Sequence, residues 1–380
     1  IWYAGAVSVP IYETSSAEQV DWILTDSGAV AIIVETPALV ELVTPVMPAA
    51  CKNIWNITYN ALATLTHDGK DVSDEEISKR RAALKPESLA TLIYTSGTTG
   101  KPKGVLSSQK GILSTMFSWA CYSTVFSEIL AKMDPSADPL LSPDLAMLHC
   151  VPLFHVTGSH AGFLMSVLVG RKIVMMKKWD AGEALRIIQE EKISDITGVP
   201  TQTWELLNHP DRKNHDMSSL KTLGGGGGPR PAEHVKQIDE QFEGRPGIGY
   251  GLSETNALGT LGNGDEYVNN PSTAGRVVPP LTEIKILDDN WDELNEGELG
   301  EIAIKTPASM VSYWKNSEAT SECMNDSGWF RTGDIGELDG EGYLRITGRK
   351  KELIVTAGGK NVAPALLEDR LRANPIISQC

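Results

Sequence analysis

Apolar positions near the start of the chain follow first a helical and then an extended pattern. Ser15 and Glu18 have the spacing of a capping box, and apolar residues recur at helical intervals over 20–24. We therefore predict a helix that begins at this point. After Gly28 every residue of 29–34 is apolar, which predicts a buried strand.

The same alternation of apolar runs and helical patterns continues along the chain. Predicted strands occupy residues 89–94, 147–151, 172–176, 195–199 and 220–223. Predicted helices occupy residues 159–168, 183–191, 201–208 and 232–242. Strands that alternate with helices are typical of an α/β fold whose parallel strands are largely buried.

The pattern changes after Pro279. Residues 282–306 and 339–348 alternate between apolar and polar positions, with turn residues between the runs, which predicts a small antiparallel β unit. The chain has 380 residues, too many for one ordinary core, so we expect two or more lobes. The predicted fold is a large, multi-lobed α/β domain with mostly parallel sheets and this antiparallel unit, followed by a smaller domain.

Composition narrows the function classes. The formal charge of −15 argues against broad nucleic-acid binding but leaves room for an anion in one locally positive pocket. The longest apolar stretch, residues 161–176, is broken by Gly170 and two cations, so no integral membrane segment is expected. The first residues lack the features of a signal peptide. The five cysteines form no CxxC pair, which favours a reducing, cytoplasmic location without structural zinc.

One loop is unusually rich in hydroxyls and glycines. The stretch LIYTSGTTGKPKG, residues 92–104, follows an apolar run. It is not the P-loop of NTPases, because Pro102 follows Lys101 and Thr95 stands where that motif needs its first glycine. A flexible surface loop and a phosphate cradle built from backbone N–H groups and hydroxyls both fit the composition.

Three later motifs carry further candidate chemistry. In GIGYGLSET, residues 247–255, Tyr250 stands between glycines and could lie flat against a base. The Ser253 hydroxyl could contact phosphate and the Glu254 carboxylate Mg²⁺. A tight turn with a buried tyrosine is the alternative. In GWFRTGDIGEL, Asp334 could accept hydrogen bonds from a ribose diol or form an Asx-turn. ITGRKKELIVTAGGKNVAP, residues 346–364, indicates a linker between lobes or an ordinary basic connector.

In order and approximate spacing, these four motifs resemble the adenylate-forming superfamily, which includes acyl-CoA synthetases, peptide-synthetase adenylation domains and beetle luciferases. The resemblance covers essentially all 380 residues. Residues 3–35 and 348–364 look most like bacterial long-chain fatty-acyl-CoA synthetases. The resemblance implies that a carboxylic acid, here a medium- to long-chain fatty acid, attacks ATP to give acyl-AMP and pyrophosphate. Coenzyme A then displaces AMP, and Mg²⁺ assists.

The resemblance also assigns roles to individual residues. The loop would close over the β- and γ-phosphates through Thr95, Ser96, Gly97, Thr98, Thr99, Gly100, Lys101 and Lys103. Tyr250 and Gly251 would meet adenine, Ser253 the α-phosphate and Glu254 the Mg²⁺, with Thr95 as a second metal contact. Asp334 and Arg349 would hold the ribose. Gly225, Gly226, Gly227 and Gly228, in the glycine run 224–228, would line the acyl pocket and the adenine edge.

The remaining roles concern the acid and the hinge. His155 would lie beside the acyl carboxylate and Lys351 at the hinge, so that His155, Glu254 and Lys351 form the implied catalytic set. Gly358 and Gly359 would face the pantetheine tunnel. The implied domains are an adenylation domain at 1–347, a hinge at 348–351 and the beginning of a small α+β domain at 352–380.

Two departures from the family pattern set further expectations. No late Gly-Lys motif follows the hinge, so we expect a chain truncated at both ends and impaired in adenylation. The Phe154–His155 pair is typical of ligases for shorter-chain and aromatic acids, which leaves the acyl chain length open. Loading of a carrier protein and non-catalytic binding of nucleotide or acyl-adenylate remain alternatives. Oligomeric state and peripheral membrane association are also left open.

Overall fold

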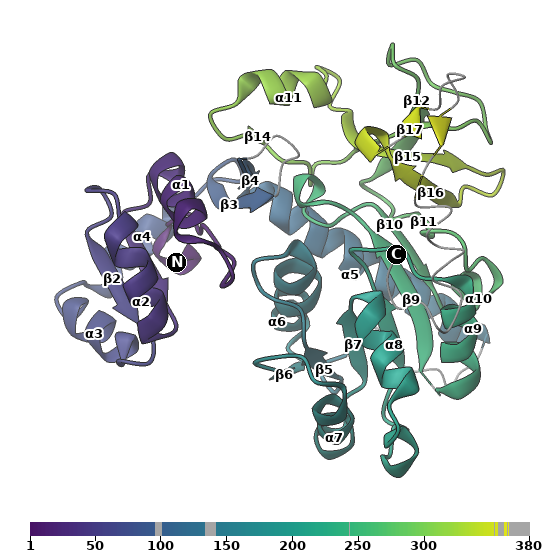
Figure 1. Cartoon of the computed structure of the whole chain (residues 1–380), viewed down its shortest axis with the longest axis horizontal. Helices are drawn as coiled ribbons and strands as arrows, with labels where there is room; N and C mark the ends of the chain where they lie inside the picture. The colour runs from purple at the N-terminus through teal and green to yellow at the C-terminus, as the bar shows by residue number, and fades with distance from the viewer. Residues whose placement is uncertain are drawn as a thin grey trace. The chain divides into compact units, whose positions relative to one another are not determined.

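The computed structural model describes residues 1–95, 101–133, 142–242, 244–352, 354–355, 361–362 and 364. The chain divides into two compact units (Figure 1). Unit 1 comprises residues 1–112 and 310–320, and unit 2 comprises residues 113–309 and 321–380. The boundary predicted at 347/348 is a different one, and it stays a prediction.

Unit 1 contains two small sheets. β3 (Leu89–Thr95) pairs antiparallel with β4 (Lys103–Ser108), and β4 pairs antiparallel with β14 (Ser312–Tyr313). β1 (Ala31–Val34) and β2 (Asn53–Asn56) form a parallel pair. The helical segments of this unit are η1 (Trp2–Ala4), α1 (Ala17–Ser27), α2 (Pro37–Val43), η2 (Thr44–Val46), α3 (Ala61–Asp68) and α4 (Asp74–Ala82).

The predicted helix and strand at the start of the chain are both present, with corrections. The capping box uses Ser16 and Gln19, one residue later than predicted, because the Ser16 hydroxyl accepts from the Gln19 N–H while the Gln19 side chain accepts from the Ser16 N–H. β1 is only partly buried: Val34 is buried, but the side of the strand that carries Ile33 is open, with Ile33 44% exposed. A two-stranded sheet leaves one face of such a strand open to solvent.

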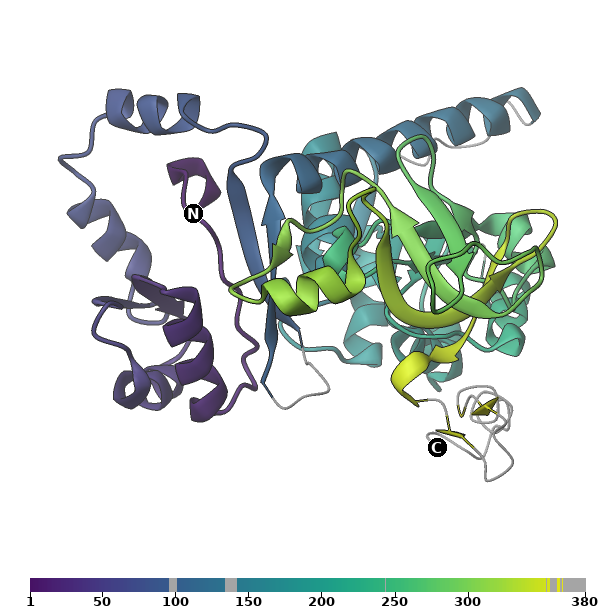
Figure 2. The ribbon, with the colours of Figure 1, turned by 90° about the horizontal axis from the view of Figure 1, so that it is seen from above.

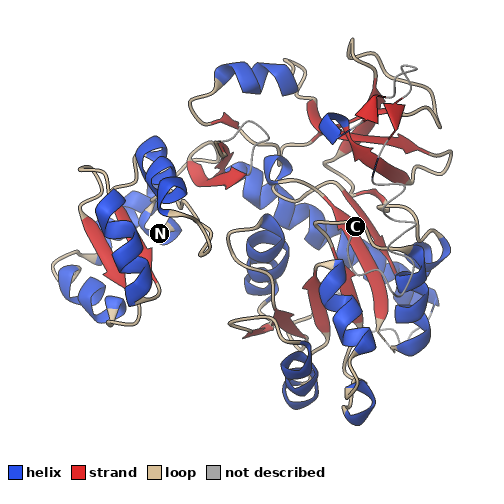
Figure 3. Cartoon of the chain, in the orientation of Figure 1, coloured by secondary structure: helices blue, strands red, loops and turns tan. Residues whose placement is uncertain are grey.

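Unit 2 is built on a seven-stranded sheet with the order β11-β10-β9-β8-β7-β5-β6. Figure 3 shows strands in red with helices in blue beside them. Its strands are β5 (Ala146–His149), β6 (Lys172–Met175), β7 (Asp195–Gly198), β8 (Thr222–Gly225), β9 (Arg245–Tyr250), β10 (Thr260–Asn263) and β11 (Arg276–Val277). β5 to β9 pair in parallel, whereas β10 and β11 are antiparallel. This confirms the predicted α/β fold with mostly parallel strands.

Helices cover this sheet and complete its core. They are α6 (Met165–Val169), α7 (Ala181–Glu191), α8 (Pro200–Asn208), η4 (Arg212–Asn214), α9 (Ala232–Gln241), η5 (Ser253–Thr255) and α10 (Gly264–Asn269), together with α5 (Gln109–Met133), which begins in unit 1. Leu185 of α7, Leu206 of α8 and Ile238 of α9 are fully buried in one cluster with Leu148 and Leu223 of the sheet. Burial of this apolar surface is the main stabilising term of the unit.

The helix predicted at 159–168 differs in type and bounds. The chain forms a π-helix, η3 (Thr157–Leu164), which continues as α6. Two glycines allow this segment to lie against its neighbours. A Cβ at Gly158 would be 2.2 Å from the Pro152 carbonyl oxygen, and one at Gly162 would be 2.9 Å from Nδ1 of His149. π-helical turns are frequent at functional sites.

The predicted antiparallel unit is also confirmed. β12 (Glu283–Leu287), β13 (Gly300–Lys305), β15 (Phe330–Leu338) and β16 (Leu344–Arg349) form a four-stranded sheet in that order (Figure 2). Further elements are α11 (Ser317–Cys323), η6 (Lys350–Glu352) and the antiparallel pair β17 (Ile354–Val355) and β18 (Asn361–Val362). Within the described part of the chain, no helix has the length and apolar character needed to cross a membrane.

Candidate active site

Three predicted site residues from distant parts of the sequence meet in unit 2. Tyr250 ends β9, Asp334 lies in β15, and Arg349 ends β16 directly opposite Asp334. The Tyr250 hydroxyl donates to Oδ2 of Asp334 at 2.7 Å, and Nε of Arg349 lies 3.1 Å from Oδ1. Asp334 is 4% exposed, so its two carboxylate oxygens are engaged inside the protein.

Burial controls the protonation of this cluster. Desolvation raises the pKa of the Asp334 carboxyl, although the Tyr250 hydroxyl and the Arg349 guanidinium act to lower it. Burial and the adjacent Asp334 charge raise the pKa of Tyr250 well above its ordinary value. Tyr250 is therefore a permanent hydrogen-bond donor at neutral pH. The predicted contact of Asp334 with a ribose stays a prediction.

The turn after Tyr250 brings backbone unusually close together. A Cβ at Gly251 would lie 2.3 Å from the carbonyl oxygen of Ala257, so only glycine fits there. Ser253 and Glu254 lie in η5, between Gly251 and Ala257 in the sequence, and both are half-buried. Asn256 and Ala257 follow with φ of 49° and 67°, a left-handed conformation that is costly for a non-glycine residue and is concentrated at functional sites.

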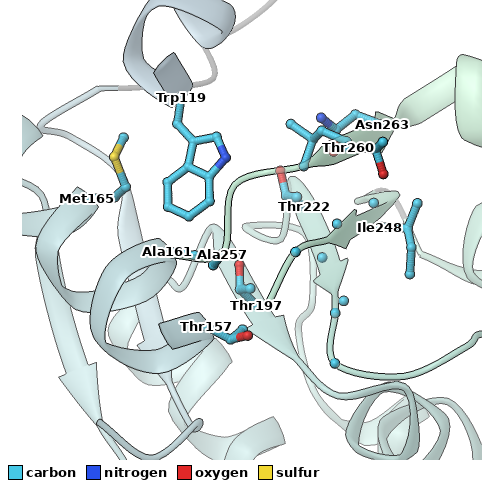
Figure 4. A pocket seen from close by; sticks show the side chains of 18 of the residues that line it. Trp119, Thr157, Ala161, Met165, Thr197, Thr222, Ile248, Ala257, Thr260 and Asn263 are labelled. Atoms are coloured by element: carbon cyan, nitrogen blue, oxygen red, sulfur yellow. The ribbon is translucent and has the colours of Figure 1, made fainter. Parts of the chain in front are cut away.

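A cavity of about 190 Å³ opens beside this turn within unit 2 (Figure 4). Trp119 and Met165 line one side of it, and Thr222 and Ile248 of the sheet line the other. The glycines on its wall are Gly224, Gly225, Gly226, Gly227, Gly247, Gly249 and Gly251. Gly225, Gly226 and Gly227 line this cavity, whereas Gly228 is not among its lining residues, and the predicted contact of these glycines with a ligand stays a prediction. We call this space the glycine-walled cavity.

A buried arginine explains part of the glycine run. Arg230 is 6% exposed and donates from Nη1 to the carbonyl oxygen of Gly247 at 3.0 Å. A Cβ at Gly225 would lie 2.3 Å from Nη2 of Arg230. The space that Gly225 leaves is thus taken by this guanidinium and not by a ligand. The sequence analysis did not single out Arg230, because its burial depends on contacts with β8 and β9.

The two histidines of the π-helical region have different environments. His155 is exposed and packs edge-on against Phe154, with ring centroids 5.0 Å apart. His160, which the sequence analysis did not select, is fully buried. Its Nδ1 lies 2.8 Å from the Ser159 hydroxyl and its Nε2 lies 3.2 Å from Oδ1 of Asn256. His160 thereby connects η3 to the strained turn after Tyr250, and the role of His155 beside a carboxylate stays a prediction.

His160 should make stability depend on pH. Burial lowers the pKa of His160 to about 4, whereas an unfolded histidine has a pKa of about 6.5. The contribution of neutral His160 to stability is therefore fully present above pH 6.5. It is lost as the pH falls toward 4, which lowers the free energy of unfolding by about 3 kcal/mol in all. In His160→Gln, the free energy of unfolding measured by urea denaturation should depend less on pH between 4.5 and 7.5. The same slope in His160→Gln as in the exposed control His67→Gln would contradict the assignment.

Lys350, within the predicted hinge at 348–351, is held by ion pairs within unit 2. Nζ of Lys350 lies 3.1 Å from Oε2 of Glu301 and 2.7 Å from Oδ1 of Asp289. Glu301 is 7% exposed and also accepts from the Gly333 N–H at 3.1 Å. The chain is thus fixed up to the residue before Lys351, although the hinge role of Lys351 stays a prediction.

Removing the Lys350 charge should destabilise the chain. Lys350→Met takes the closest cation from the buried Glu301 carboxylate, and we expect the free energy of unfolding to fall by about 1–2 kcal/mol. The matched control is Lys285→Met, which removes a cation from the exposed Glu293 and should change stability by less than about 0.5 kcal/mol. Urea denaturation measures both. Equal effects of the two variants would show that burial of Glu301 is irrelevant.

The glycine- and hydroxyl-rich loop belongs to unit 1 and joins the antiparallel strands β3 and β4. Thr95 ends β3 and pairs with Lys103. Nζ of Lys101 lies 4.1 Å from the ring centre of Trp22, and Nζ of Lys103 lies 5.0 Å from that of Tyr313. Several residues with predicted contacts lie outside the described part of the chain. They are Ser96, Gly97, Thr98, Thr99, Gly100, Gly358 and Gly359.

No protein-only metal centre is present in the part of the chain that the structure describes. No group of three or more His, Cys, Asp or Glu side chains gathers there. A single half-exposed carboxylate such as Glu254 fits Mg²⁺, because this ion is commonly held by one or two carboxylates together with phosphate oxygens and water.

Comparison with known proteins shows which family the chain resembles. A family model described as AMP-binding enzyme matches residues 1–314. The chain is 35% identical to the long-chain-fatty-acid–CoA ligase FadD15 of Mycobacterium bovis, over 99% of this chain and 66% of that protein. It is 30% identical to a feruloyl-CoA synthase of Amycolatopsis, over 99% and 70%. The chain thus spans just under two thirds of the FadD15 length.

Solved structures agree with these relatives. The o-succinylbenzoate CoA synthetase MenE of Bacillus subtilis, in complex with its acyl-adenylate intermediate, superposes with a TM-score of 0.80 and is 25% identical in sequence. The alignment covers 98% of this chain and 68% of that one.

Proposed function

Because the chain belongs to the family of AMP-binding enzymes, we propose that it activates a carboxylic acid with ATP, forming acyl-AMP and releasing pyrophosphate. The acyl group would then pass to coenzyme A, as the names of its relatives describe for them. A medium- to long-chain fatty acid is the proposed acid, in line with the FadD15 relatives.

One observation carries this proposal. The Tyr250–Asp334–Arg349 cluster directly adjoins the glycine-walled cavity, because Gly249 and Gly251 on either side of Tyr250 line that cavity. A planar base against Tyr250 and an acid in the cavity would therefore meet at the turn around Gly251. Holding two reactants in one orientation is the main contribution that a protein makes to such a displacement.

The chain's own residues would act by positioning and charge. Asp334 and Arg349 would orient the ribose, Ser253 would contact the α-phosphate, and Tyr250 would keep Asp334 fixed by donating a hydrogen bond to it. Glu254 would supply a carboxylate oxygen to Mg²⁺. That ion, when bound, neutralises charge on the phosphates.

Acid-dependent exchange of pyrophosphate into ATP tests the proposal. The assay would use carboxylic acids from acetate to C18 together with coumarate, on this chain and on a longer chain that carries a complete small domain. Exchange that depends on the acid supports the ligase function. Absence of exchange with every acid in both folded chains would contradict it and would favour a protein that only binds nucleotide.

A further inference from the structure

One end of the glycine-walled cavity differs from the rest because Arg171, the one charged side chain among its lining residues, lies there. The cavity follows β8 from Gly225, at the carboxyl end of the strand, to Thr222 at its first residue. The other end adjoins Tyr250, and the wall in between combines glycine backbone and apolar side chains such as Trp119 with hydroxyl side chains such as Thr157 and Thr197. At the amino end of the strands, Thr222 and Arg171 line the cavity. An acid whose carboxylate lies near Tyr250 would therefore direct its other end toward these two polar side chains.

Arg171 is buried and only partly satisfied by the protein. Its side chain is 7% exposed. Nε donates to the Ser166 hydroxyl at 2.9 Å and Nη2 approaches Sδ of Met147 at 3.5 Å, where sulfur is a weak acceptor. Nη1 lies 3.9 Å from Oδ2 of Asp195, which is an ion pair but too long for a hydrogen bond. A guanidinium has five N–H donors, so an oxygen atom in the cavity would improve its hydrogen bonding.

The charge balance at this end favours a neutral oxygen. Asp195 is 9% exposed and accepts from the Ser194 hydroxyl at 2.6 Å. Because Asp195 already offsets the charge of Arg171, a second carboxylate would add an uncompensated buried charge. A purely apolar tail would instead lie against polar groups that it cannot satisfy. A hydroxyl or carbonyl oxygen avoids both costs.

Resting on the proposed function, we propose that the acid is compact and carries a hydroxyl or carbonyl oxygen at the end remote from its carboxylate, where it bonds to Arg171 and Thr222. The cavity volume of about 190 Å³ supports a compact acid, because sites for drug-sized ligands usually have about 300–1,000 Å³. This acid replaces the medium- to long-chain fatty acid suggested by the FadD15 relatives and leaves the proposed adenylation reaction unchanged.

Paired acids test the proposal. Adenylate formation would be measured with 4-hydroxycinnamate against cinnamate and with 10-hydroxydecanoate against decanoate. In the pair that the protein uses better, we expect kcat/KM to favour the hydroxylated acid by about tenfold or more. Arg171→Met should remove that preference by raising KM for the hydroxylated acid. The exposed Arg186 of α7 gives the matched control, Arg186→Met.

The outcomes separate this inference from the proposed function. Activation of both members of each pair with equal kcat/KM would overturn the inference and leave the ligase function standing, as would a preference for decanedioate over 10-hydroxydecanoate. Activation of no acid would instead contradict the proposed function. Should Arg171→Met fail to fold, Thr222→Val removes the hydroxyl of the other proposed contact at nearly constant volume. Calorimetric binding of the same paired acids then gives a readout that does not require turnover.

Discussion

Asp334→Asn is expected to reduce acid-dependent pyrophosphate exchange by about 100-fold or more, mainly through a higher KM for ATP. The carboxylate binds the Tyr250 hydroxyl and the Arg349 guanidinium through different oxygens. An amide of the same size turns one of these oxygens into a donor that faces another donor. It also removes the charged acceptor proposed for the ribose, and each hydrogen bond to a charged group is worth about 1.5–3 kcal/mol. Exchange kinetics against ATP concentration measure the effect.

Tyr250→Phe is the companion variant for this prediction. It keeps the ring that is proposed to lie against the base and removes only the hydroxyl that orients Asp334, so a loss of about tenfold is expected. Both variants should fold, since the Arg349 side chain is largely exposed and loses little when its partner changes. An unchanged KM for ATP in Asp334→Asn would show that this cluster is structural and does not bind the nucleotide.

The sequence predicted the fold because its local patterns agree with one another. Short apolar runs located β5, β6, β7 and β8 of the seven-stranded sheet, helical spacing located helices that pack on it, and alternation after Pro279 located the antiparallel sheet. The errors are local. The capping box begins at Ser16 because two serines in succession offer alternative N-caps, and Gln19 can close the box as well as Glu18 can. Sequence spacing also cannot distinguish a π-helix from an α-helix, as the region from Thr157 shows.

The candidate site was predictable only where a motif marks it. Tyr250, Asp334 and Arg349 each belong to a motif, and the structure brings all three together. Arg230, Arg171 and His160 were missed, because what distinguishes them is burial against strands that are distant in sequence. A lone arginine or histidine carries no local signal of this kind. The one available hint was the glycine run itself, since Gly225 is required by the guanidinium of Arg230 and not by a ligand.

Gly251→Ala is expected to have the second large effect, by disrupting the turn that connects Tyr250 to Glu254. The added Cβ would lie 2.3 Å from the carbonyl oxygen and 2.4 Å from the carbonyl carbon of Ala257. Both neighbours are backbone atoms, so the clash can be relieved only by moving the turn. Overpacking of this kind costs about 1–3 kcal/mol, and Ala257 already has a strained, left-handed backbone. We expect stability to fall by about 2 kcal/mol and exchange activity by at least tenfold.

Two other glycines separate strain from loss of space in the cavity. A Cβ at Gly228 would meet nothing within 4 Å, so Gly228→Ala should leave stability and activity nearly unchanged. A Cβ at Gly249 would lie 3.6 Å from Leu261, an ordinary contact, but Gly249 lines the cavity. Gly249→Ala should therefore raise KM for the acid without lowering stability. If Gly251→Ala behaved like Gly249→Ala, with normal stability and only a higher KM for the acid, Gly251 would be required for cavity space and not for the close approach of Ala257.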